Sequence, residues 1–151
     1  MLADNIIIRD NSLSKSDCDY LIELYEKTGP NKMFHDYYVM GIQPPGDERI
    51  RNILSKIGLS GILVDWCEVA KRTPGTGHPN HYDDFTEHTV GTSVTYLNDN
   101  FTGGETYFVD DIAVRPKIGR TLYFDGLSRE HGVHTVKDFS RYTLAVWYKA
   151  K

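Results

Sequence analysis

Apolar residues recur at helical spacing in two segments of the first half of the chain. In the first, Ser14 is a favourable N-cap with Asp17 three residues on, a near relative of the capping box, and Gly29-Pro30 would end a helix. The apolar stripe between these signals is formed by Cys18, Leu21, Ile22 and Tyr25. A second helix is predicted between Pro44-Pro45-Gly46 and Gly58, with a stripe formed by Ile50, Ile53, Leu54 and Ile57.

Beyond Gly61 the pattern changes to short β-rich runs separated by Gly, Asn, Asp or Pro. Together with an early run at Asn5–Arg9, the predicted strands are 62–69, 92–97, 105–109, 121–124 and 141–148. Antiparallel strands preceded by two helices predict a mainly β fold with flanking helices. We expect a double-stranded β-helix, a jelly-roll or cupin-like barrel with the N-terminal helices packed on one sheet. Residues 1–151 are expected to form a single domain.

Composition narrows the choice of partners. The chain has 151 residues, 40% hydrophobic and 25% charged, which is ordinary for a soluble globular domain. Its formal net charge of -4 argues against a nucleic-acid partner, because binding a phosphate backbone needs a clustered basic face. No apolar run approaches the roughly 18 to 20 residues of a membrane span, so no membrane partner is expected.

The start of the chain and its cysteines bear on location. Met1–Asn5 lacks the basic start of a secretory leader. Cys18 and Cys67 are too few and too far apart for a disulfide framework or a cysteine-built zinc site. We therefore expect a cytoplasmic protein.

His81 and Asp83 lie beside a Gly-rich stretch, and residues two apart in an extended chain point to the same face. An imidazole and a carboxylate would therefore converge. Taken alone, such a triplet is more often an ordinary surface feature than a metal site. The order along the chain changes this, because His131 follows and Arg141 stands ten residues after His131, in a β-rich run that continues to Trp147.

This order resembles the prolyl 4-hydroxylase-like branch of the Fe(II)/2-oxoglutarate-dependent dioxygenases, whose pattern has His-x-Asp, then His, then a basic residue nine or ten positions later. The resemblance extends over most of the chain. Further similar stretches are Asn11–Ile22, Tyr96-Leu97-Asn98, Gly103–Phe108, and Pro116 with Gly119, Leu122 and Phe124.

The resemblance implies an enzyme that hydroxylates a substrate while 2-oxoglutarate is oxidised to succinate and carbon dioxide. By it, His81, Asp83 and His131 bind Fe(II), and two imidazoles with one carboxylate leave positions open for 2-oxoglutarate and O2. Arg141 would hold the far carboxylate of 2-oxoglutarate, because a guanidinium offers a planar fork of donors. Tyr96 would reach the same carboxylate and Trp147 would wall the pocket. Ascorbate is the reductant to test.

Each of these residues also has an ordinary interpretation. The alternative interpretation of Arg141 is a surface residue of an edge strand, and that of Tyr96 and Trp147 is aromatic core. His134 is the closest rival of His131, but the spacing to Arg141 selects His131. His78 and His88 are expected in solvated loops, and a substrate-facing role stays open for both. His35 is expected at the surface.

The substrate shell departs from the usual family pattern. Thr89 stands where relatives acting on peptidyl proline often carry arginine, and Thr73 and His78 stand where tyrosines are common. Ala145 replaces a hydroxyl-bearing residue of some relatives. The leading prediction is prolyl hydroxylation of a peptide or protein. The alternatives are oxidation of a free amino acid or other small molecule, a non-catalytic cupin-like metal-binding module, and a zinc hydrolase on the same three ligands. The oligomeric state is not predicted.

Overall fold

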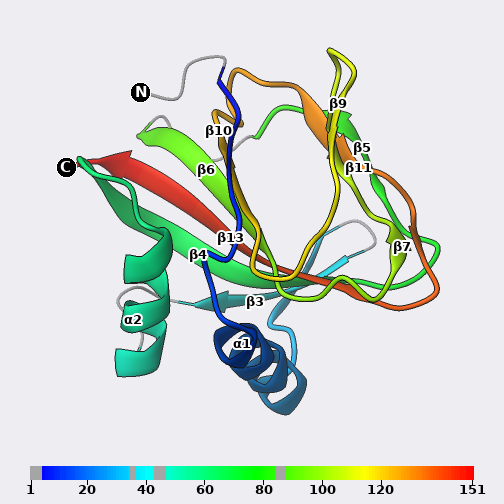
Figure 1. The fold of residues 1–151 in the computed structure, drawn as a ribbon, viewed down its shortest axis with the longest axis horizontal. Coiled ribbons are helices and arrows are strands. Elements are labelled where there is room, and N and C mark those ends of the chain that lie inside the picture. Colours follow the sequence, from blue (N-terminus) through cyan, green and yellow to red (C-terminus); the bar gives the residue numbers. More distant parts are fainter. Residues whose placement is uncertain (1–4, 35–36, 43–46, 84–87) are drawn as a thin grey trace.

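The computed structural model describes residues 5–34, 37–42, 47–83 and 88–151 (Figure 1). Two sequence expectations lie outside these residues. They are the break at Pro44-Pro45-Gly46 and the surface position of His35.

The strands that the structure describes are antiparallel and form two larger sheets and one small one. The major sheet runs in the order β1 (Ile7–Arg9), β10 (Thr121–Phe124), β6 (Thr89–Tyr96), β13 (Arg141–Ala150), β4 (Ile62–Arg72), β3 (Tyr37–Ile42) and β2 (Lys32–Phe34). The minor sheet runs in the order β5 (His78–His81), β11 (His131–Val133), β8 (Thr106–Phe108) and β9 (Ile112–Val114). The small sheet pairs β12 (Val136–Lys137) with β7 (Thr102–Gly103).

Both predicted helices are present. Helix α1 (Lys15–Thr28) is capped by Ser14, whose hydroxyl accepts a hydrogen bond from the Asp17 backbone N–H at 3.1 Å. It ends at Gly29, whose φ of 81° lies in the left-handed region that glycine tolerates. Helix α2 (Glu48–Ile57) is capped by Asp47, which accepts from the Ile50 N–H at 2.8 Å.

The helices cover one face of the major sheet. Their apolar stripes share a core with side chains that alternate along the two central strands, namely Cys67, Val69, Leu144, Val146 and Tyr148. Figure 1 shows α1 and α2 on one side of β4 and β13, and the minor-sheet strands β5 and β11 on the other. The prediction of a mainly β fold with the helices packed on one sheet is therefore confirmed.

The opposite, inner face of the major sheet carries the intervening residues of β4 and β13. On this face Arg72 lies beside Arg141, Ala70 beside Thr143, and Glu68 beside Ala145. These residues face the minor sheet across an internal cavity, and so charged side chains lie on the inside of the fold.

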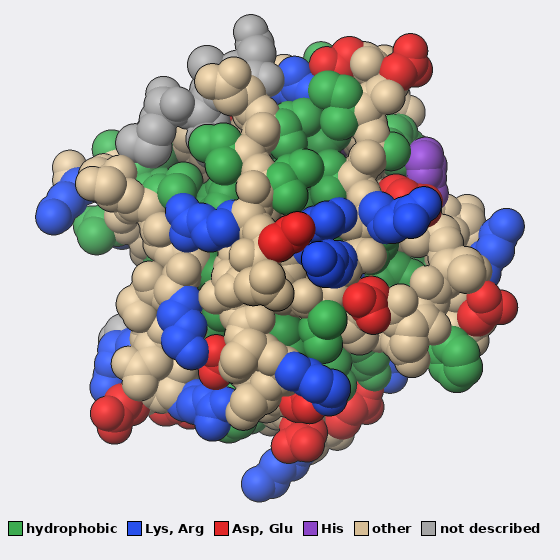
Figure 2. Space-filling model, viewed as in Figure 1, with side chains coloured by type: hydrophobic (Ala, Val, Ile, Leu, Met, Phe, Trp, Pro, Cys, Tyr) green, Lys and Arg blue, Asp and Glu red, His purple; other side chains and the backbone are tan. Residues whose placement is uncertain are grey.

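Among the described residues, no helix is long and apolar enough to cross a membrane. Figure 2 shows Lys and Arg side chains interleaved with Asp and Glu over one face of the molecule. A polyanion would therefore meet both signs of charge on this face.

Candidate metal and co-substrate site

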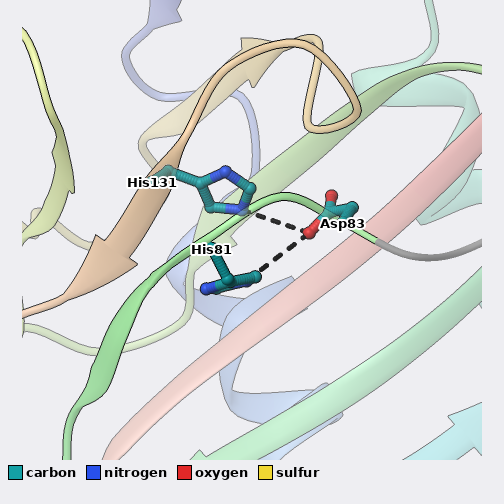
Figure 3. Close-up of side chains that lie close together, drawn as sticks. All are labelled: His81, Asp83 and His131. Atoms are coloured by element: carbon teal, nitrogen blue, oxygen red, sulfur yellow. Dashed lines mark hydrogen bonds and ion pairs between the residues drawn. The ribbon is translucent and has the colours of Figure 1, made fainter.

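Three potential metal ligands converge between the minor sheet and the segment that follows β5. His131 on β11 lies directly opposite His81 on β5, and their ring centroids are 4.5 Å apart. Asp83 follows β5 by two residues, and one ligand atom from each of the three side chains lies within 4.8 Å of the others. Figure 3 shows both imidazoles directed at the Asp83 carboxylate. The Nε2 atoms lie 3.1 Å (His131) and 3.7 Å (His81) from Asp83 Oδ1.

Backbone carbonyls fix the tautomer of both imidazoles. The Nδ1 of His81 lies 2.9 Å from the Pro79 carbonyl oxygen, and the Nδ1 of His131 lies 2.7 Å from that of Arg129. Because a carbonyl oxygen only accepts, each Nδ1 carries a proton. In a neutral ring the Nε2 lone pair is then directed at the centre of the cluster, which is the form in which histidine binds a metal.

The Asp83 carboxylate is held from its other side. Its Oδ2 accepts hydrogen bonds from Thr92 Oγ1 at 3.2 Å and from Trp147 Nε1 at 3.3 Å. Gly126 allows this approach, because a Cβ there would lie 1.9 Å from Oδ2. Oδ1 is thereby left facing the two imidazoles.

Asp83 is ionised at neutral pH. Burial on its own would raise its pKa, but hydrogen bonds and charge interactions with His131 and His81 outweigh burial and hold the pKa well below the ordinary value. Once both imidazoles exchange the Nε2 proton for a metal, the cluster would offer one anionic and two neutral ligands.

The cluster opens into a cavity of about 100 Å³ between the two sheets. Its walls include the inner faces of β4 and β13, with apolar contributions from Val94, Phe124 and Val133. His81, Asp83 and His131 line the same cavity as Arg141. The structure thus brings the three predicted iron ligands and Arg141 into one cavity.

Arg141 is a buried cation in this cavity. Its side chain is 3% exposed, donates to the Gly104 carbonyl at 2.9 Å and to Thr106 Oγ1 at 3.2 Å, and lies 5.3 Å from the centroid of the Tyr96 ring. Burial lowers the pKa of Arg141, yet a guanidinium stays protonated in proteins. No ion pair involves Arg141 in the part of the chain that the structure describes, and a buried charge of this kind favours an anionic ligand.

The two aromatic candidates occupy different places. Trp147 lines the cavity and contacts Asp83. Tyr96 is fully buried, and its hydroxyl pairs with Thr106 Oγ1 at 2.7 Å. Thr106 thus links the Tyr96 hydroxyl to the Arg141 guanidinium.

The remaining histidines lie apart from the cluster or at its edge. His134 stacks on Tyr107 and pairs with Glu105 at 3.0 Å, with its side chain about half exposed. His78 packs against His81 with ring centroids 4.0 Å apart. His88 is exposed.

Several polar residues of the site were not predicted from the sequence, among them Thr92, Thr106, Glu68 and Arg72. Once Arg141 is assumed to point inward, strand alternation predicts which other residues of β13 point inward. The inward-facing residues of β4 cannot be predicted in this way, because they depend on the register of β4 against β13. That register puts Glu68 and Arg72 inside.

No family model matches the chain. A comparison with curated proteins finds human prolyl 3-hydroxylase 3, which is 38% identical over 64 residues. The match covers 38% of this chain and 9% of that much longer protein.

Solved structures match over nearly the whole chain. A viral collagen prolyl hydroxylase from Paramecium bursaria Chlorella virus-1, solved as a 2-oxoglutarate complex, has a TM-score of 0.76 and 22% identity, covering 99% of this chain and 97% of that chain. A Pseudomonas putida prolyl-4-hydroxylase has a TM-score of 0.73 and 18% identity, covering 99% and 94%. A Trichoplax adhaerens prolyl hydroxylase, in complex with a hypoxia inducible factor peptide fragment, has a TM-score of 0.69 and 20% identity, covering 98% and 84%. At these identities the likeness shows a shared fold, and the resemblance seen in the sequence motifs is confirmed at that level.

Proposed function

We propose that this chain is an Fe(II)- and 2-oxoglutarate-dependent dioxygenase that hydroxylates prolyl residues of a peptide or protein. In the overall reaction, substrate, 2-oxoglutarate and O2 give hydroxylated substrate, succinate and carbon dioxide. One observation carries the proposal: a cluster of two histidines and one aspartate shares a buried cavity with an arginine that lacks an ion-pair partner among the described residues.

The residues fit an iron ion. Two neutral imidazoles and one carboxylate are the ligand set of non-haem Fe(II) oxygenases, and the hydrogen bonds on each Nδ1 leave Nε2 available. We assign the ligands as His81, Asp83 and His131. When bound, iron supplies the redox chemistry by which O2 oxidises 2-oxoglutarate and the substrate.

Arg141 would bind and orient 2-oxoglutarate. Its guanidinium would pair with the far carboxylate, with the Thr106 hydroxyl beside it. Tyr96 would act one step further out, by holding Thr106. The arginine and the cluster lie in one cavity, and so the co-substrate would be held at both ends.

Other residues of the lining would position Asp83 or exclude water. Thr92 and Trp147 fix the orientation of Asp83 through Oδ2. The apolar side chains of Val94, Phe124 and Val133 would help to exclude water from the cavity, because they offer water no hydrogen-bond partner.

The prolyl substrate is supported by the neighbours that share the fold, which are prolyl hydroxylases, one of them bound to a peptide. We further propose that the two larger sheets form a double-stranded β-helix of jelly-roll type and that residues 1–151 form a single oxygenase domain. A cytoplasmic location is supported by Cys18 and Cys67, which are both free thiols.

The test is succinate release from proline-bearing peptides in the presence of Fe(II), ascorbate and 2-oxoglutarate. We expect succinate to form with iron and not with zinc. Metal uptake without consumption of 2-oxoglutarate would favour a non-catalytic metal-binding module. Activity that survives replacement of iron by zinc would favour a hydrolase.

A further inference from the structure

Glu68 is an acidic residue inside the cavity that the proposed function does not use. It lies on the inner face of β4, is 6% exposed and lines the same cavity as Asp83. Its neighbours across the two adjacent strands are small: Ala145 on β13 and Gly41 on β3. The carboxylate is therefore not covered by a large side chain from either strand.

The Glu68 carboxylate is fixed in place. Its Oε1 accepts a hydrogen bond from Trp66 Nε1 at 3.0 Å. The Trp66 ring lies over Gly41, where a Cβ would come within 2.5 Å of the ring. A side chain at position 41 would therefore displace the indole that orients Glu68.

Glu68 has no ion pair with a basic residue among the described residues. The nearest basic residue on the same face of β4 is Arg72. Its guanidinium stacks at 3.9 Å from the centroid of the Tyr37 ring and donates to the Gly77 carbonyl at 3.3 Å. Burial raises the pKa of Glu68, and the hydrogen bond from Trp66 opposes this. The charge of Lys32 and, to a smaller extent, that of Arg72 also lower the pKa, while the charge of Asp83 raises it. A carboxylate in such a position gains most from a cation that enters the cavity.

Iron and 2-oxoglutarate do not supply that cation. The positive charge of Fe(II) would be matched by Asp83 and by the near end of 2-oxoglutarate, whose far carboxylate would be matched by Arg141. Glu68 therefore remains for the third occupant of the cavity, the substrate.

We propose that Glu68 binds a protonated amine of the substrate. This rests on the iron- and 2-oxoglutarate-dependent activity of the proposed function and adds a requirement for an amine to its substrate, which can then be a free amino acid as well as a peptide. The nitrogen of an internal prolyl residue is acylated and carries neither a charge nor a proton, whereas free proline, an amino-terminal prolyl residue and a lysine side chain each present an ammonium N–H to a carboxylate.

The test is substrate binding to the anaerobic protein loaded with Fe(II) and 2-oxoglutarate, measured by calorimetry. The probes are L-proline, prolyl-glycyl-glycine, its N-acetyl form, and acetyl-lysyl-glycine amide. We expect at least one amine probe to bind about tenfold or more tightly than N-acetyl-prolyl-glycyl-glycine. The probe that binds best identifies the source of the amine.

Glu68→Gln keeps the size of the side chain and an oxygen that can accept from Trp66, and it should abolish this preference. Asp65→Asn is the matched control, because it removes one negative charge from the same strand at a residue that pairs with Lys149 instead. It should keep the preference. Equal binding of the amine and acetylated probes, or a preference that survives in Glu68→Gln, would overturn the inference.

Failure of the proposed function has a different signature. If the N-acetyl peptide supports iron-dependent succinate formation as well as the amine probes do, the dioxygenase stands and the role of Glu68 fails. If the wild-type protein binds no 2-oxoglutarate, the proposed function fails and the inference fails with it.

Discussion

His131 lies directly opposite His81 in the β5–β11 ladder, with the two ring centroids 4.5 Å apart. Strand pairing thus holds together two histidines that are far apart in sequence. Asp83 then needs only to follow β5 by two residues to complete the cluster. The spacing of the ligands is therefore set by backbone hydrogen bonds, which are stiffer than a loop.

His131→Ala should abolish iron-dependent turnover, whereas His134→Ala should retain it. His131 points into the cluster, and His134 stacks on Tyr107 with its Nδ1 paired to Glu105. Iron binding and succinate release should be measured on both variants. The opposite result would assign the ligand to His134.

Arg141→Ala should raise the KM for 2-oxoglutarate by about 10- to 150-fold, because it removes charge-assisted bonds worth roughly 1.5 to 3 kcal/mol. Arg141→Lys should recover part of the loss, since the charge remains and the planar fork does not. Arg115→Ala, at an exposed position, is the control. An unchanged KM in Arg141→Ala would show that Arg141 does not bind 2-oxoglutarate.

Trp147→Phe should weaken iron binding by about 10- to 100-fold, because it removes the indole N–H that Asp83 Oδ2 accepts and keeps an aromatic ring in the cavity wall. Thr92→Val removes the other donor to the same oxygen and should act in the same direction. Iron titration of both variants would measure this. Wild-type affinity in both would show that these contacts do not orient the ligand.

Glu68 should make the metal-free protein less stable as pH rises. Burial raises its folded-state pKa above the ordinary value of 4.5, so below that value both folded and unfolded states are protonated and no penalty exists. As pH rises through the folded pKa, the folded state must hold a buried carboxylate. The free energy of unfolding, measured with urea between about pH 4 and pH 8, should therefore fall relative to Glu68→Gln. A constant difference between the two proteins would contradict this.

Both thiols should resist modification in the folded protein. Burial raises the pKa of Cys18 to about 11 and that of Cys67 to about 12. Since the thiolate is the reactive form, an aromatic disulfide reagent at about pH 8 should react with neither cysteine until denaturant is added. Rapid reaction of one thiol in the folded protein would show that its environment is more open than described.

Local signals in the sequence predicted the helices and several strands. Ser14 and Gly29 mark the ends of α1, and the run at 121–124 coincides with β10. Shorter strands escaped prediction: β5 contains a proline and two histidines, and β11 has a central glycine. Such sequences have little β propensity of their own, and they become strands because they pair with each other.

Chemistry-bearing residues were predicted where a motif of several residues pointed to them, as for His81, Asp83, His131 and Arg141. Glu68 belongs to no such motif. The residues around Glu68 in the sequence do not indicate which face of β4 its side chain is on. Only the register of β4 against β13 shows that it points inward. A polar residue that lines a cavity through register alone leaves no signal in a single sequence.

The position of β13 in the sheet has a consequence for the folding of the newly synthesised chain. This strand follows all other described strands in sequence, yet it lies between β6 and β4 in the middle of the major sheet. The major sheet therefore cannot be completed until this last strand has been synthesised. Arg141 and Trp147 belong to that strand, and so a chain that ended before it would contain the three proposed iron ligands but neither the proposed co-substrate arginine nor a continuous sheet.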